Sequence, residues 1–103
     1  MDREALVKLI VQKGVRKVNL SMFSELERKG ILQEVVEVLL RQGKASEAVE
    51  IIEHVDAKRF ADLLRPIAEQ CVELRDYRKA ALIFERIGDH ELAEFINENF
   101  VKR

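Results

Sequence analysis

The sequence has few aromatic residues, few of the glycines and prolines that interrupt helices and strands, and only one cysteine. Among its 103 residues it has no tryptophan, one tyrosine, five phenylalanines, four glycines, one proline and one cysteine. A hydrophobic core must therefore be mainly aliphatic. The single cysteine, Cys71, cannot form a disulfide within the chain, which favours a reducing, cytoplasmic compartment. No apolar run approaches the roughly 20 residues that a transmembrane helix needs, so no membrane association is predicted.

An excess of charge of one sign is also absent. Lys and Arg total 18 and Asp and Glu total 19, which gives a net charge of −1. This balance provides no bulk attraction to nucleic acid, so nucleic acid is not the expected partner. Charged residues still make up 36% of the chain. Many Glu, Lys and Arg residues beside few Asn and Gln are typical of heat-tolerant proteins, which favours a thermophilic source.

The arrangements that usually signal catalysis or metal binding are missing as well. His54 and His90 stand apart, with neither an HxxxH motif nor paired cysteines. Cys71 falls in an apolar helical pattern, which indicates a packing residue rather than a nucleophile. There is no glycine-rich phosphate loop and no Ser-His-Asp arrangement. The sequence therefore predicts a protein that is not an enzyme and that holds no cofactor or metal.

Helical periodicity is what the sequence has in abundance. Leu32, Val35, Val36, Leu39 and Leu40 recur at the spacing of one face of an amphipathic helix. No segment alternates with the period of two that a strand requires. Periodic segments at 2–13, 20–30, 32–42, 45–55, 57–74, 77–87 and 90–100 predict an all-α fold of about six to seven helices.

The start of the second helix has alternative interpretations. Asn19 or Ser21 can cap it, or it begins later at a capping box formed by Ser24 and Glu27. Gly30 is predicted to end this helix, and Gly43 to end the next one.

Pro66 leaves a second boundary open. An apolar pattern continues through it without a break, over Phe60, Leu63, Leu64, Ile67, Cys71 and Leu74. A proline inside a helix removes one hydrogen bond and costs about 3 kcal/mol, typically as a kink. We favour one kinked helix. The alternative is a short helix that ends near Leu64, with Pro66 opening the next.

Two parts of the chain resemble each other. Aligning Gly43 with Arg75 places Ala48 on Ala80 and Ile52 on Phe84. A second offset aligns Val7 with Val36, Ile10 with Leu39 and Gly14 with Gly43. Self-similarity of this kind is typical of stacked helical hairpins, each of which needs its neighbour to bury its apolar face.

The pattern of residues 64–87 carries a family resemblance. The packing positions of a first helix are occupied by Leu64, Ile67, Ala68 and Cys71. Asp76 and Tyr77 lie in the turn, and the packing positions of the second helix are occupied by Ala80, Phe84 and Ile87. A weaker copy comprises Leu32, Val35, Val36, Leu39, Ala48, Ile52 and Val55. These segments resemble tetratricopeptide-like (TPR-like) repeats, which implies stacked antiparallel helical hairpins in an α-solenoid. The chain departs from the family in four respects. Val36 replaces a small residue, the closing proline is absent, the spacing is below about 34 residues, and the final helix follows early, at Gly88 and Asp89.

The resemblance implies a domain organisation and a binding face. It predicts one domain over 1–103, with repeat-like units at about 2–30, 31–55 and 56–88 and a capping helix at 89–101. The concave face would be lined by Gln33, Glu37, Leu40 and Arg41 in one repeat and by Arg65, Glu69, Val72 and Glu73 in the other. Because Glu37 and Glu69 stand where clamps for a C-terminal carboxylate carry Lys and Asn, a basic or apolar peptide suits this face better.

The predicted function is that of a protein-interaction module that binds a peptide or helix, or that self-associates as a homo-oligomer. The alternative is a nucleic-acid-associated protein with a helix-turn-helix near Val15–Gln42, which would need a contiguous basic face.

Overall fold

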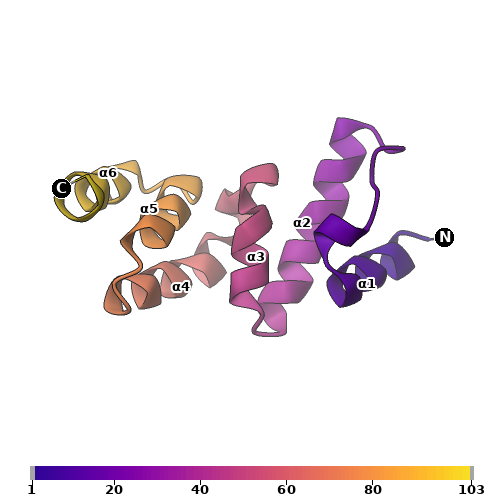
Figure 1. Cartoon of the computed structure of the whole chain (residues 1–103). Helices are drawn as coiled ribbons and strands as arrows, with labels where there is room; N and C mark the ends of the chain where they lie inside the picture. Colours follow the sequence, from indigo (N-terminus) through magenta and orange to yellow (C-terminus); the bar gives the residue numbers. More distant parts are fainter. Residues whose placement is uncertain (1, 103) are drawn as a thin grey trace. The chain divides into compact units, whose positions relative to one another are not determined.

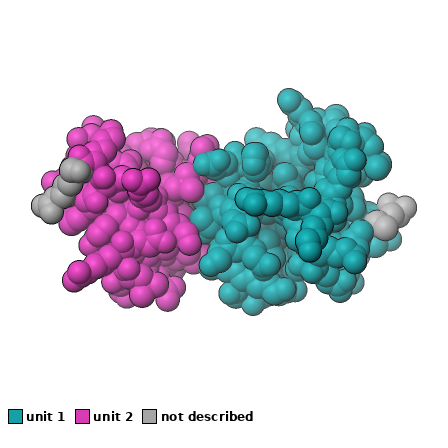
Figure 2. All heavy atoms as spheres, in the orientation of Figure 1, with its two compact units in different colours: residues 1–55 teal, residues 56–103 magenta. Residues whose placement is uncertain are grey.

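The computed structural model describes residues 2–102 of the chain. The structure is 79% helix, and residues 2–102 contain six α-helices, four short 3-10 or π segments and no strand. The predicted all-α class is confirmed. The chain divides into two compact units, Met1–Val55 and Asp56–Arg103 (Figure 2). Each unit has a central helix against which its other helices pack.

In the first unit the central helix is α2 (Glu25–Arg41). It packs against α1 (Arg3–Lys13) and α3 (Ala45–Ile51) (Figure 1). Two 3-10 turns, η1 (Val15–Lys17) and η2 (Ile52–His54), follow α1 and α3. The buried side chains are aliphatic, as the composition predicts: Val7, Ile10, Val11, Ile31, Leu32, Val35, Val36, Leu39, Ala48, Val49, Ile51 and Ile52.

The start of α2 is a capping box. The Ser24 hydroxyl accepts a hydrogen bond from the Glu27 N–H, and the Glu27 carboxylate accepts one from the Ser24 N–H. These hydrogen bonds lower the pKa of Glu27 below its usual value, and the bond from the Ser24 backbone has the largest effect. Asn19 caps no helix, because its side chain accepts from the Ser21 N–H within the preceding loop. Of the alternative starts, the later one is therefore correct.

The prediction that Gly30 ends a helix is wrong. Helix α2 continues through Gly30 and ends at Arg41, so the two helices expected over 20–30 and 32–42 are one. A glycine inside a helix costs only about 1 kcal/mol, which the buried residues that follow it in α2, from Ile31 to Leu39, can offset. Gly30 also lies next to the end of the Arg3 side chain of α1. A Cβ at Gly30 would lie 2.5 Å from Nη2 of Arg3, whose Nε is 3.1 Å from Oε1 of Glu34.

In the second unit the central helix is α5 (Tyr77–Arg86), which packs against α4 (Ala61–Glu73) and α6 (His90–Ile96) (Figure 1). A 3-10 turn, η3 (Ala57–Phe60), precedes α4, and a π-helical turn, η4 (Asn97–Val101), extends α6. Alanines are prominent in the core, which allows close approach of helices. The buried residues are Ala57, Leu64, Ala68, Cys71, Ala80, Ala81, Ile83, Phe84, Ile87, Ala93 and Ile96.

Pro66 lies inside α4, so the helix is not broken there and the alternative of two short helices is wrong. The side chain of Pro66 is exposed, while Leu64 and Ala68 beside it are fully buried. Burial of this helix face on α5 therefore compensates for the hydrogen bond that the proline cannot donate.

Three turns between helices share one backbone geometry. The α2–α3, α4–α5 and α5–α6 turns pass through residues with left-handed φ, namely Gly43 (75°), Arg75 (61°) and Gly88 (96°). In each turn the N–H of that residue donates to the carbonyl three residues earlier, at 3.0 to 3.2 Å. The next N–H donates to the carbonyl five residues earlier, at 2.8 or 2.9 Å. This is the Schellman geometry, and it lets each helix end and the next begin within three residues.

The first prediction concerns Arg75, the one non-glycine residue with positive φ in residues 2–102. A left-handed conformation costs a residue with a Cβ about 1–2 kcal/mol. Arg75→Gly should therefore raise the free energy of unfolding by about 1 kcal/mol, because glycine's greater unfolded-state entropy offsets part of the gain. The free energy of unfolding is measured by urea titration, with far-UV circular dichroism as the signal.

Gly43→Ala is the matched control for Arg75→Gly. A Cβ at Gly43 would meet no atom within 4 Å, so only its φ matters. This variant should lose about 1 kcal/mol. A destabilised Arg75→Gly variant would show that the left-handed turn does not strain the arginine.

The second prediction concerns Lys44, the N-cap of α3. Its φ and ψ, −93° and 60°, nearly match those of Asp76 (−89°, 71°) and Asp89 (−90°, 71°). Those aspartates cap α5 and α6 by accepting from the N–H groups of Lys79 and Leu92, whereas Lys44 makes no side-chain cap. Lys44→Asp should stabilise the chain by about 1 kcal/mol in urea unfolding. Lys44→Ala separates loss of the lysine from gain of the cap, and equal stability of the two variants would contradict the expectation.

Candidate functional site

The binding residues predicted on α4 form one exposed strip of that helix. Arg65, Glu69, Val72 and Glu73 recur at intervals of three or four residues, and all four are exposed. The spacing places them together on the side of α4 away from the core. Leu63 and Leu74 were expected in the core, but they are 47% and 72% exposed. The α4 surface is therefore more apolar than the sequence pattern suggested.

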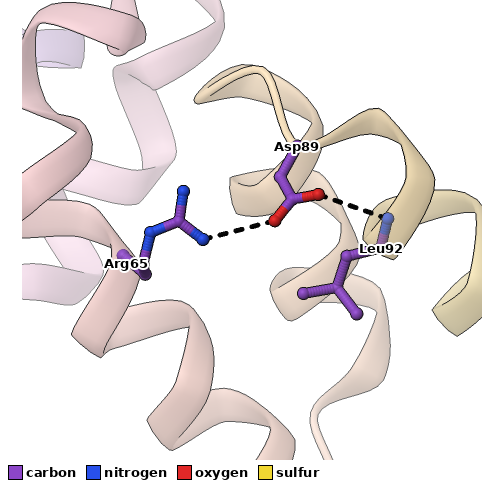
Figure 3. Close-up of polar contacts among 3 residues, drawn as sticks. All are labelled: Arg65, Asp89 and Leu92. Atoms are coloured by element: carbon purple, nitrogen blue, oxygen red, sulfur yellow. Dashed lines mark hydrogen bonds and ion pairs between the residues drawn. The ribbon is translucent and has the colours of Figure 1, made fainter.

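Arg65 is held in place by a contact that the sequence did not reveal. Its Nη1 lies 3.2 Å from Oδ2 of Asp89, and the other carboxylate oxygen of Asp89 accepts from the Leu92 N–H (Figure 3). One half-buried carboxylate thus caps α6 and anchors a side chain of α4. An exposed ion pair contributes at most about 1 kcal/mol, but this one fixes the direction of the guanidinium.

Among the residues of the α4 strip, the two glutamates are available for a ligand. Neither Glu69 nor Glu73 has an ion-pair partner within residues 2–102. Val72, which is 36% exposed, lies between them in sequence. The strip thus combines two uncompensated negative charges with an apolar side chain, a combination that suits a cationic, partly apolar ligand.

The binding residues predicted on α2 have the same spacing as those on α4, but only two of them line a cleft. Glu37 and Arg41 form an ion pair, with 2.6 Å between Oε1 and Nη2. Together with Arg3, Glu4, Val7, Glu34 and Val38, they line a cleft of about 370 Å³ beside α1. Gln33 and Leu40 are half-buried and do not line this cleft. Because the charges of Glu37 and Arg41 compensate each other, α2 provides less net charge for a ligand than α4.

Sequence reasoning did not identify an aromatic surface in the second unit. The rings of Tyr77 and Phe100 are stacked with centroids 4.5 Å apart, and Phe95 meets Phe100 edge-on at 6.2 Å. Phe95 is 56% exposed and Phe100 is 44% exposed. Half of the aromatic residues of this chain therefore gather where α5 meets α6 and η4. A signal was present in the sequence, since Phe95 lies on the polar side of the last predicted helix.

Cys71 is buried, as predicted for a packing residue. Desolvation, with a smaller contribution from the Asp76 carboxylate, raises the pKa of its thiol, and Lys79 partly opposes this. Within residues 2–102 no cluster of His, Cys, Asp or Glu could hold a metal ion. No helix in that range is long and apolar enough to cross a membrane.

The third prediction concerns the reactivity of this thiol. A buried thiol with a raised pKa is mostly protonated and sterically shielded at neutral pH. The native chain should react with a water-soluble disulfide reagent at pH 7 at least about tenfold more slowly than the urea-unfolded chain, because only local opening exposes the sulfur. The absorbance of the released chromophore measures both rates. Native and unfolded rates that agree would place Cys71 at an accessible site.

Comparisons with known proteins identify no relative of this chain, so its function must be inferred from its surfaces. No protein-family model matches the sequence, and neither a curated protein nor a solved structure matches it. The functional argument therefore starts from the α4 strip (Arg65, Glu69, Val72 and Glu73) and from the exposed aromatic residues.

Proposed function

We propose that this chain is a non-enzymatic protein-interaction module built from TPR-like helical hairpins, and that it binds a basic, partly apolar peptide or helix. The observation that supports this most is the repeated turn between helices. Three turns with the same backbone geometry join consecutive helices, and the residues aligned by the internal repeat, Gly43 and Arg75, occupy the same position in two of them. Recurrence of one turn is expected of stacked hairpins.

Equivalent packing of small residues supports the same proposal. Ala48 and Ala80, aligned by the repeat, are both 0% exposed. Each lies on the helix that follows one of these turns, α3 and α5, which pack against α2 and α4. A small side chain at such a position lets two helices approach closely. The exposed side of the first helix of the second pair, α4, is then available to contact a partner.

The α4 strip is the surface that we expect to bind. Glu69 and Glu73 provide negative charge, Val72 and the nearby Leu63 provide apolar surface, and Arg65 is directed by Asp89. A peptide with lysines or arginines beside an apolar side chain would satisfy both features. An acidic peptide would be repelled.

The fourth prediction tests this strip. A fluorescently labelled amphipathic peptide rich in Lys and Leu should bind the chain, and fluorescence anisotropy gives its Kd. The double variant Glu69→Lys, Glu73→Lys should raise that Kd at least about tenfold, or about 1.4 kcal/mol, because it reverses two charges that lack internal partners. A peptide with Glu in place of Lys should bind the variant better than the unmodified chain.

Glu50→Lys is the matched control. Glu50 is an exposed residue of α3, and its replacement reverses an acidic side chain outside the binding residues predicted on α2 and α4. It should leave the Kd within about twofold. Circular dichroism verifies that each variant is folded. Equal binding by the double variant and the unmodified chain would show that the α4 strip is not the binding surface.

A further inference from the structure

The aromatic face is defined as Tyr77, Phe95 and Phe100. The segment that carries Phe95 and Phe100 is acidic, whereas the exposed Arg78 follows Tyr77. From Glu91 to Val101 the chain has three glutamates, Glu91, Glu94 and Glu98, and no lysine or arginine. Only Glu98 has an ion-pair partner within residues 2–102, at 3.4 Å from Nζ of Lys102. Exposed aromatic rings beside unpaired carboxylates favour a ligand that is both apolar and cationic, because cations also bind the faces of aromatic rings.

The first unit has a surface with the opposite charge. Two hollows, of about 540 and 280 Å³, adjoin the connector between α1 and α2 and share Val15 and His54 in their linings. We call them together the connector groove. Its partly exposed apolar residues are Val15, Val18 and Leu20. The lining also includes buried side chains of the core, Ile10, Val11, Leu32, Leu39 and Ile51.

The charged residues of the connector groove are predominantly basic. Five cations line it, Lys13, Arg16, Lys17, Arg28 and Lys29, against three carboxylates, Glu25, Glu47 and Glu50. None of the five cations has an ion-pair partner within residues 2–102. The groove therefore offers apolar surface for aromatic rings and uncompensated positive charge for carboxylates.

We propose that the aromatic face of one copy of this chain binds the connector groove of a second copy, so that copies associate head to tail. The aromatic face offers exposed rings and carboxylates, and the connector groove offers apolar residues and cations. Phe95 and Phe100 would cover apolar lining of the groove, while Glu91 and Glu94 would meet the cations around it. This names the two surfaces through which the homo-oligomer predicted from the sequence would form. The inference rests on the proposed function as a protein-interaction module.

Charge also argues against a symmetric pairing of like surfaces. Two aromatic faces brought together would juxtapose their unpaired glutamates, and two connector grooves would juxtapose their cations. A contact between different surfaces is heterologous, so each copy keeps one surface free for a further copy. The assembly should therefore grow with concentration, and high salt should weaken it because exposed charges steer it.

The fifth prediction tests this association by sedimentation velocity over a concentration series up to roughly 1 mM, which reports weak dissociation constants. The unmodified chain should sediment faster as concentration rises. Two variants should each weaken association at least about tenfold. The face variant is Phe95→Ser with Glu94→Lys, and the groove variant is Arg16→Glu with Lys17→Glu. All four side chains are exposed, so the fold should be retained.

Mixing the two variants is the decisive measurement. The face variant keeps its groove and the groove variant keeps its face, so an equimolar mixture should form one-to-one dimers that neither variant forms alone. Arg59→Glu is the matched control, because it reverses an exposed cation that belongs to neither the aromatic face nor the lining of the connector groove. This control should associate like the unmodified chain.

Three results would overturn the proposal. They are an unmodified chain that stays monomeric over the whole series, association unaffected by the face or groove variants, and a variant mixture that forms no dimer. Any of these can occur while the α4 strip still binds the basic peptide, so the failure of this inference is distinguishable from the failure of the proposed function.

Discussion

The structure depends on a turn that reverses the chain within three residues. A left-handed residue at Gly43, Arg75 or Gly88 allows two backbone N–H groups to bond to carbonyls at the end of the preceding helix. Without such bonds the last carbonyls of each helix would need water or side-chain partners. Because the turn is so short, consecutive helices must pack against each other. Their apolar faces are then buried locally, and each unit forms its core from neighbours in sequence.

Close packing after these turns relies on small side chains. Alanines occupy fully buried positions on α3, α4 and α5, where a larger side chain would push the helices apart. Phe84 is the one buried phenylalanine of the second unit, while Phe95 and Phe100 lie substantially exposed. The apolar residues of this unit are thus divided between an alanine-rich core and an aromatic surface.

Charge on this protein is local rather than global. The net charge of −1 conceals an acidic stretch on α6 and a cluster of unpaired cations beside the connector of the first unit. Among the binding residues predicted on α2, Glu37 and Arg41 compensate each other, whereas Glu69 and Glu73 on α4 have no such partner within residues 2–102. A surface can therefore attract a charged ligand even when the whole chain is nearly neutral, because screening limits each interaction to about 10 Å.

The sequence by itself determined the helical class and most helix ends, because caps and turns depend on neighbouring residues. Asp2, Ser24, Asp76 and Asp89 each accept an N–H three residues onward, as short polar side chains do at helix starts. Tertiary structure decided what depends on distant residues. It carried α2 through Gly30, where burial of the following residues offsets the cost of a helical glycine, and α4 through Pro66, where packing on α5 offsets the lost hydrogen bond. It also left Leu63, Leu74 and Phe95 exposed and joined Arg65 to Asp89, because periodicity marks the faces of a helix but not which of them a neighbour covers.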